Sequence, residues 1–192
     1  MTLHLPTIET DRLLLRPFQI SDSSQVMALA GDRLVYETTF NIPHPYEAGV
    51  AEKWIASLAS QFHEEKGVTF AITIKRDLVL IGAIGLGATS RHRRAELGYW
   101  IGVPYWNQGY CSEAASAVIN FGFSELGYHK ITSRHMINNP ASGRVMEKAG
   151  MMLEGVLVDE LFKDGQFHTL KVYGILNSDQ ADGTSVVKER MA

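Results

Sequence analysis

Hydrophobic residues recur along this chain with two different spacings, and each spacing predicts one kind of element. Alternating or continuous apolar runs predict strands at residues 12–18, 68–74, 78–86, 95–103, 130–136, 153–162 and 167–176. Apolar residues three and four positions apart predict helices at about residues 21–31, 47–66, 110–126 and 140–149. This order predicts an α/β (α+β) fold, in which about four helices flank a mixed, mainly antiparallel sheet of about six to seven strands.

Turn and cap residues set the boundaries of these elements. Ser21 or Asp22 can cap the first helix, and Asn139 can cap the last, with Pro140 at its first position. The sequence Lys-Asp-Gly at 163–165 predicts a hairpin between the last two strands. We expect residues 1–177 to form one domain and residues 178–192 to form a polar, frayed tail.

Composition narrows the class of protein. The chain has 192 residues and a formal net charge of −3, and no run approaches the roughly 18 apolar residues of a membrane span, so we expect no membrane partner. The first residues lack the pattern of a signal peptide, and the single cysteine, Cys111, excludes an internal disulfide. Both features predict a cytoplasmic protein. His129, His135 and His168 have no metal-ligand spacing, so we expect no metal.

The nearly balanced charge gives no general attraction to nucleic acid. Residues 91–94 read Arg-His-Arg-Arg and form one short basic cluster. We interpret this cluster as a solvated loop in preference to an RNA site, so no direct nucleic-acid partner is expected.

The segment from Trp106 to Ala114 contains the most informative turn, because a glycine there ends a strand and opens a helix. The first amides of a helix lack internal partners and lie at the positive end of its dipole, which suits a phosphate. The same pattern also occurs in ordinary connections. The chain lacks the Gly-Lys-Ser/Thr ending of a P-loop and the Gly-x-Gly-x-x-Gly of a dinucleotide site, which removes two common alternatives.

This turn, the segment 139–151 and the order of elements resemble the GNAT acetyltransferases. The segments 13–18 and 96–101 and the terminal hairpin are similar to the RimJ/RimL branch, which acetylates N-terminal amines of ribosomal proteins. The resemblance spans about residues 8–177. Trp106 and Cys111 stand where the broad family has Arg or Gln and Gly or Ala, and cysteine is small enough to keep the amides accessible.

The resemblance implies acetyl-coenzyme A as the acetyl donor. Five residues of the turn would bind its pyrophosphate through their amides, namely Gln108, Gly109, Tyr110, Cys111 and Ser112. The strand end formed by Ile101, Gly102 and Val103 would pair with the pantetheine arm, while Gly98 and Gly102 either ease a bulge or close approach there or merely bend the strand. Asn139 and Ser142 would lie near coenzyme A, with Ser142 close to the thiol.

An amine must be neutral before it attacks a thioester, and an α-amine with a pKa of about 8 needs a weaker base than a lysine with a pKa of about 10.4. Glu96 is the preferred base, directly or through water, although it is equally typical of a solvent-facing strand residue. Glu160 is the second candidate, and either acid can instead hold a cationic substrate. Ser142 would bond or relay a proton to the departing sulfur. We reject Cys111 as a nucleophile, since no His-Asn pattern accompanies it.

The predicted function is an N-acetyltransferase that transfers an acetyl group to a primary amine by direct attack. The first candidate for this amine is the N-terminal α-amine of a protein such as a ribosomal protein. Tyr36 and Phe40 would line the acceptor pocket, while Trp100 and Trp106 would border the cofactor cleft. The alternatives are acetylation of a small amine (a polyamine or an antibiotic), non-catalytic binding of an acyl-coenzyme A, and RNA or ribosome docking. The sequence permits a homodimer without requiring one, so a monomer and a homodimer both stay open.

Overall fold

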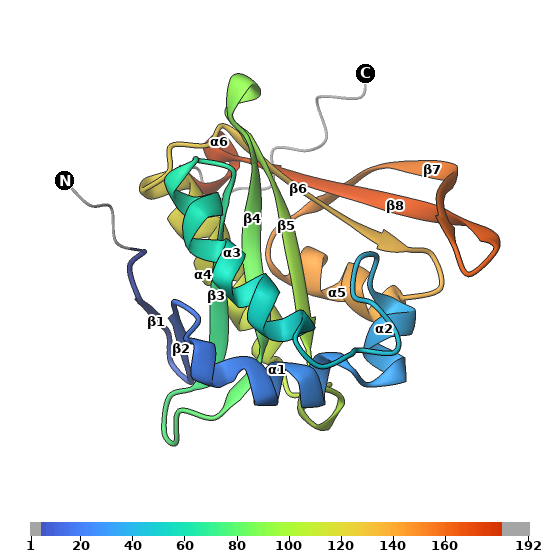
Figure 1. Cartoon of the computed structure of the whole chain (residues 1–192). Coiled ribbons are helices and arrows are strands. Elements are labelled where there is room, and N and C mark those ends of the chain that lie inside the picture. Colours follow the sequence, from blue (N-terminus) through green and yellow to red (C-terminus); the bar gives the residue numbers. More distant parts are fainter. Residues whose placement is uncertain (1–4, 182–192) are drawn as a thin grey trace.

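The computed structural model describes residues 5–181, which form an eight-stranded sheet with helices on both faces (Figure 1). The strands are β1 (Ile8–Glu9), β2 (Leu13–Arg16), β3 (Gly67–Ile74), β4 (Leu80–Thr89), β5 (Arg94–Ile101), β6 (Lys130–Met136), β7 (Met152–Lys163) and β8 (Gln166–Leu176). The helices are α1 (Ser23–Ala30), α2 (Arg33–Thr38), α3 (Val50–His63), α4 (Tyr110–Ser124), α5 (Pro140–Lys148) and α6 (Asn177–Ala181). The strand order is β1-β2-β3-β4-β5-β6-β8-β7, and every neighbouring pair except β5 and β6 is antiparallel.

The predicted fold class is confirmed, and the structure adds three short elements that periodicity did not predict. Strand β1 and helices α2 and α6 have two, six and five residues, which is too short for a hydrophobic period to emerge. Helix α2 instead begins at a cap, where the Asp32 carboxylate accepts a hydrogen bond from the Leu34 amide at 2.8 Å. Helix α6 includes the first four residues of the predicted tail, 178–181, and residues 182–192 of that tail lie outside the described part.

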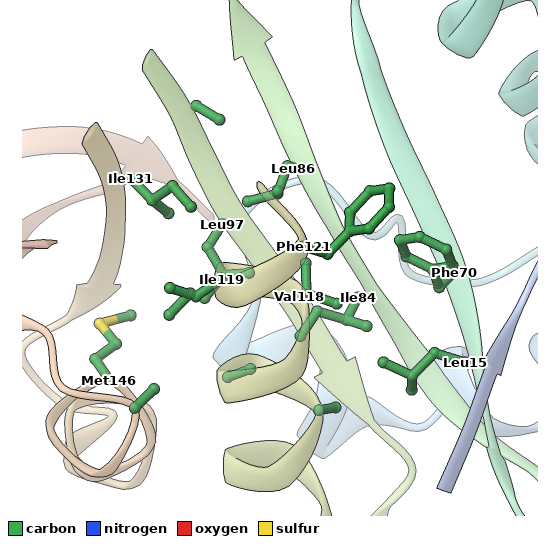
Figure 2. Close-up of a cluster of buried hydrophobic side chains, with 14 of the residues drawn as sticks. Leu15, Phe70, Ile84, Leu86, Leu97, Val118, Ile119, Phe121, Ile131 and Met146 are labelled. Carbon is green, nitrogen blue, oxygen red and sulfur yellow. The ribbon is translucent and has the colours of Figure 1, made fainter. Parts of the chain in front are cut away.

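The main core lies between the sheet and helices α4 and α5 (Figure 2). Leu15, Ile84 and Leu97 project from three different strands toward Val118 of α4, and all four side chains are almost fully buried. A smaller apolar cluster on the opposite face packs α1 and α3 against the sheet. The helices therefore cover both faces, and each strand facing them carries the alternating or continuous apolar run that the sequence shows.

Strands β5 and β6 separate along their length, and this separation positions the candidate site. They pair in parallel only from Arg94 to Glu96, opposite Lys130 to Thr132. One residue further on, the Ser133 hydroxyl donates to the Leu97 carbonyl at 2.8 Å, and no strand pairing continues beyond it. The carboxyl halves of the two strands therefore diverge, with the first turns of α4 and α5 beside the gap.

The β7–β8 hairpin extends from the sheet toward α2 (Figure 1). Its tip is tied to α2, because the Lys163 ammonium donates to the carbonyls of Tyr36 and Thr39, the latter at 2.7 Å. The Tyr36 hydroxyl also donates to the Asp164 carboxylate. Between residues 157 and 161 the pairing register of β7 shifts, and Asp159 adopts a left-handed conformation with φ of 53°. The hairpin thus has a bulge in its outer strand.

Within residues 5–181, no helix combines the length and the apolar character needed to cross a lipid bilayer.

Candidate functional site

The turn before α4 presents a cluster of main-chain donors. Gly109 has φ of +81°, a conformation that glycine adopts without strain, and it directs the chain into the helix. The amides of Tyr110, Cys111 and Ser112 donate no hydrogen bond to another group in the described chain. Together with the positive end of the helix dipole, these amides supply the donors and the local polarity that binding of an anion requires.

Arg12, which immediately precedes β2, forms hydrogen bonds to residues on both sides of this turn. Its Nε donates to the Glu113 carboxylate at 2.7 Å, and its Nη1 donates to the Gln108 carbonyl at 2.9 Å. Its guanidinium also lies 4.6 Å from the centre of the Tyr110 ring. Burial tends to raise the pKa of Glu113, but the hydrogen bonds from Thr10 and Arg12 outweigh it, so the pKa is lowered. Sequence reasoning missed Arg12, because 96 residues separate it from Gln108.

The end of β5 borders the same turn. The Ile101 carbonyl accepts a hydrogen bond from the Trp106 indole at 2.6 Å, and the Gly102 amide donates to the Ile81 carbonyl at 2.8 Å. The Gly102 carbonyl also accepts a bond from the Tyr105 amide at 2.9 Å. Since main-chain groups alternate between the two sides of a strand, the Ile101 amide faces the gap while both groups of Gly102 are engaged within the protein.

Gly98 and Gly102 of this segment have different surroundings: Gly102 is closely packed, whereas Gly98 has open space beside it. A Cβ on Gly102 would lie 2.7 Å from a methyl carbon of Leu29, so the glycine allows α1 to approach. Gly98 pairs in regular register with Gly85 of β4, so the bulge that we considered from sequence is absent at this position. A Cβ on Gly98 would meet no atom within 4 Å.

The first turn of α5 faces β5 across the gap. The Asn139 side chain caps the helix by accepting a bond from the Ser142 amide at 3.3 Å, which confirms the predicted cap. The Ser142 hydroxyl lies 2.9 Å from the Tyr99 hydroxyl, which also donates to the Ser142 carbonyl at 3.1 Å. Burial raises the pKa of Tyr99 above its ordinary value, so the phenol stays protonated. Sequence reasoning missed Tyr99, although it alternates with Ile101 along the same strand.

These elements enclose a cavity of about 280 Å³. Seven of the predicted cofactor-binding residues line it: Ile101, Gly109, Tyr110, Cys111, Ser112, Asn139 and Ser142. Three others, Gly102, Val103 and Gln108, are absent from its lining. Trp100 and Trp106 do line it. Burial raises the pKa of the Cys111 thiol to about 12, so the thiol stays neutral despite its place at a helix start.

The two predicted carboxylates meet around an arginine that sequence reasoning did not single out. Arg134 of β6 donates to Glu96 from Nε at 2.9 Å and from Nη2 at 3.3 Å. Its Nη1 lies 4.0 Å from the Glu160 carboxylate, and its guanidinium lies 5.9 Å from the centre of the Phe40 ring. Glu96 therefore has an ion-pair partner and is not the free solvent-facing glutamate that we considered.

Glu96 and Phe40 line a second, larger cavity on the face of the sheet that carries α1 and α3. Tyr36, which we expected in the acceptor pocket, lines neither cavity, because its ring and hydroxyl contact Lys163 and Asp164 at the hairpin tip. Glu160 is also absent from both linings and reaches this region through its proximity to Arg134.

His135 is a further buried polar residue of β6, and it is 4% exposed. Its Nδ1 lies 2.8 Å from the Met136 carbonyl, and burial lowers its pKa, so the ring is neutral. Within residues 5–181, no group of three or more His, Cys, Asp or Glu side chains is arranged to bind a metal ion.

Comparison with known proteins identifies the relatives of this chain. The family described as "Acetyltransferase (GNAT) domain" matches residues 12–152. The N-acetyltransferase YoaA of Bacillus subtilis, which is named as uncharacterized, is 33% identical over 172 residues, or 89% of this chain and 97% of the relative. A GNAT-family acetyltransferase from Bacillus anthracis superposes with a TM-score of 0.80 at 26% identity, over 90% of this chain and 99% of that one. RimJ of Mycobacterium smegmatis, solved with coenzyme A disulfide, superposes with a TM-score of 0.82 at 19% identity, over 91% of this chain and 88% of its own.

Proposed function

The chain belongs to the GNAT family of N-acetyltransferases, and we propose that the amine it acetylates is the terminal α-amine of a protein, such as a ribosomal protein. The observation that carries the proposal is the meeting of three features at one cavity: open amides at the start of α4, an unpaired edge of β5, and the Tyr99–Ser142 hydroxyl pair. A cytoplasmic location and a monomeric or homodimeric state stay predictions from the sequence.

The family uses acetyl-coenzyme A, whose thioester supplies an activated acetyl group. The residues present fit this donor, since the amides of Tyr110, Cys111 and Ser112 can bind its pyrophosphate without a competing internal partner. The Ile101 amide faces the gap between β5 and β6, where it can pair with an amide of the pantetheine arm or polarise the thioester carbonyl.

Ser142 is suited to hydrogen-bond the departing sulfur. Its hydroxyl can accept a hydrogen bond from the Tyr99 phenol, when that O–H turns from the Ser142 carbonyl, and can then direct its own O–H at the sulfur, because the two oxygens are 2.9 Å apart. This arrangement would deliver a proton to the thiolate as the acetyl group leaves it.

Glu96 is the first candidate for removing the proton from the amine, directly or through water. Any carboxylate is a weak base, and that of Glu96 is held in place by two hydrogen bonds from Arg134. A weak base suffices for an α-amine, whose deprotonation at pH 7 costs about 1.4 kcal/mol, but not for a lysine, for which the cost is about 4.6 kcal/mol. Glu160 stays the second candidate.

The proposal is tested by following thiol release from acetyl-coenzyme A with two peptides. The first has a free α-amine and no lysine, while the second has a formylated N-terminus and one lysine. We expect release with the first peptide only. Release with the second alone would contradict the choice of the α-amine, and binding of coenzyme A without release for any amine would favour a non-catalytic acyl-coenzyme A binding protein.

Variants of the same protein test the assigned roles. We expect Glu96→Gln to lower kcat by about 100-fold, a typical loss when a general base is removed, with little change in the affinity for coenzyme A. Ser116 of α4, whose hydroxyl donates to the Ser112 carbonyl at 3.1 Å, provides a control, and Ser116→Ala should keep the parental kcat. An unchanged kcat in Glu96→Gln would remove this residue from the mechanism.

A further inference from the structure

The second cavity has a volume of about 710 Å³, within the usual range for sites that bind small molecules or peptide side chains. It adjoins the first cavity, since five residues line both: Thr38, Thr39, Tyr99, Trp100 and Ser142. These shared residues include the Tyr99–Ser142 pair, so the junction is the place where an amine from the second cavity would meet a thioester in the first.

The lining of the second cavity is mainly aromatic and aliphatic. Five aromatic side chains contribute to it: Phe40, Tyr46, Trp54, Tyr99 and Trp100. Each of the five is partly buried. Such a surface binds aromatic and bulky aliphatic groups by removing them from water.

Few charged side chains line the same cavity, and each of them pairs with a side chain of opposite charge. Among the described residues that line it, Glu96 is the one acid, and its carboxylate accepts two hydrogen bonds from Arg134. Lys66, at another part of the lining, forms an ion pair with Glu64 at 2.5 Å. An acceptor with several ammonium groups, such as a polyamine, would need several carboxylates that are not already paired.

Gly98 lines this cavity without a side chain that would occupy part of its volume. It lies between Glu96 and Trp100 on β5, and by strand alternation the three residues face the same side of the sheet. No atom lies within 4 Å of the place where its Cβ would be. Its backbone does not have the positive φ that would require glycine, so the missing side chain provides space and not conformational freedom.

We propose that the second cavity binds the body of the amine acceptor, and that this body is an aromatic or bulky aliphatic group next to a single amine, as in a peptide whose first residue is phenylalanine. The inference rests on the proposed function. It adds to that function the chemical class of the acceptor's first residue. A small first residue would leave most of the aromatic surface in contact with water, and a polyamine would bring charges that the cavity does not balance.

The first test compares three acceptors: two peptides that differ only in a first residue of phenylalanine or alanine, and spermidine. We expect kcat/KM for the phenylalanine peptide to exceed that for the alanine peptide by on the order of 10- to 100-fold, the usual discrimination by a hydrophobic pocket. Spermidine should be no better than the alanine peptide. Equal rates for the two peptides, or a preference for spermidine, would overturn the inference while leaving acetyl transfer established.

The second test fills the cavity with Gly98→Val. We expect this variant to lose at least tenfold in kcat/KM for the phenylalanine peptide and to keep its affinity for coenzyme A. Gly155→Val is the matched control, because Gly155 is also a strand glycine without positive φ and without neighbours within 4 Å, and it lines neither cavity. An unchanged rate in Gly98→Val would place the acceptor elsewhere.

Calorimetry separates failure of this inference from failure of the proposed function. The phenylalanine peptide is titrated into the complex of the protein with coenzyme A, for the parent chain and for both valine variants. Binding that Gly98→Val abolishes and Gly155→Val preserves would support the cavity even if no acetyl transfer occurred. Absence of both binding and transfer would overturn the two proposals together.

Discussion

The hydroxyl of Ser142 is held in place by the phenol of Tyr99, which comes from another element. Ser142 itself was predictable from the segment that resembles the family, but its partner was not, because strand periodicity identifies Tyr99 only as an apolar position. The same holds for Glu96. The sequence indicates a carboxylate on the strand that leads to the cofactor turn, whereas its ion pair with Arg134 depends on how β5 and β6 lie side by side.

Tyr99→Phe tests whether this phenol positions the serine. We expect kcat to fall about tenfold, equivalent to about 1.4 kcal/mol, because the Ser142 hydroxyl loses the group that orients it. The KM for acetyl-coenzyme A should stay close to the parental value, since the amides of α4 are untouched. Steady-state kinetics give both values. Tyr128→Phe, at the far end of α4, serves as the control, and equal losses in both variants would indicate a general effect on packing.

At the scale of elements, helix α2 and the β7–β8 hairpin depend on one another. The Lys-Asp-Gly signal correctly predicted the turn at the hairpin tip, and Gly165 has the positive φ of +75° that such a turn requires. The bulge at Asp159 was not predictable, because aspartate adopts positive φ only when surrounding contacts favour it. Helix α2 was missed as well, and its end is bonded to Lys163, a residue more than 120 positions away.

Lys163→Met measures this contact between elements. Methionine keeps much of the side-chain length but removes the hydrogen bonds to the Tyr36 and Thr39 carbonyls. We therefore expect the free energy of unfolding to fall by about 1–2 kcal/mol, as for loss of hydrogen bonds from a charged group. Denaturation in urea gives this value. Lys53→Met, on the exposed side of α3, should change stability far less, and similar losses for both variants would refute the assigned contact.

At the scale of the whole molecule, Arg16 and Asp22 join the sheet to the first helix. The Asp22 carboxylate accepts hydrogen bonds from Arg16 Nη1 and Nη2, each at 2.8 Å, and from the Gln19 amide at 2.8 Å. The sequence suggested Asp22 as a cap for α1, but its side chain makes no capping bond to that helix. Burial tends to raise the pKa of Asp22, and these hydrogen bonds outweigh it, so the pKa in the folded protein is lowered.

A lowered carboxylate pKa stabilises the folded protein above the ordinary value of 3.8, and this stabilisation is lost as the pH falls through the lower folded-state value. We expect Asp22→Asn to reduce the free energy of unfolding by roughly 2 kcal/mol at pH 7, and the difference from the parent to shrink below pH 4. Urea denaturation across this pH range measures both. The exposed pair Arg33–Glu37 is the control, because Glu37→Gln should have a small effect. A deficit for Asp22→Asn that does not shrink below pH 4 would contradict this origin.

The sequence by itself determined the order and type of the long elements, the cap at Asn139 and the glycine turn before α4, because each depends on neighbours within a few positions. Only the tertiary structure decided which groups meet at the site. The divergence of β5 from β6 and the placement of two cavities next to each other beside Ser142 arise from contacts between residues far apart in the chain. Local patterns carry no record of such contacts, since many pairings of the same strands and helices would satisfy the same hydrophobic periods.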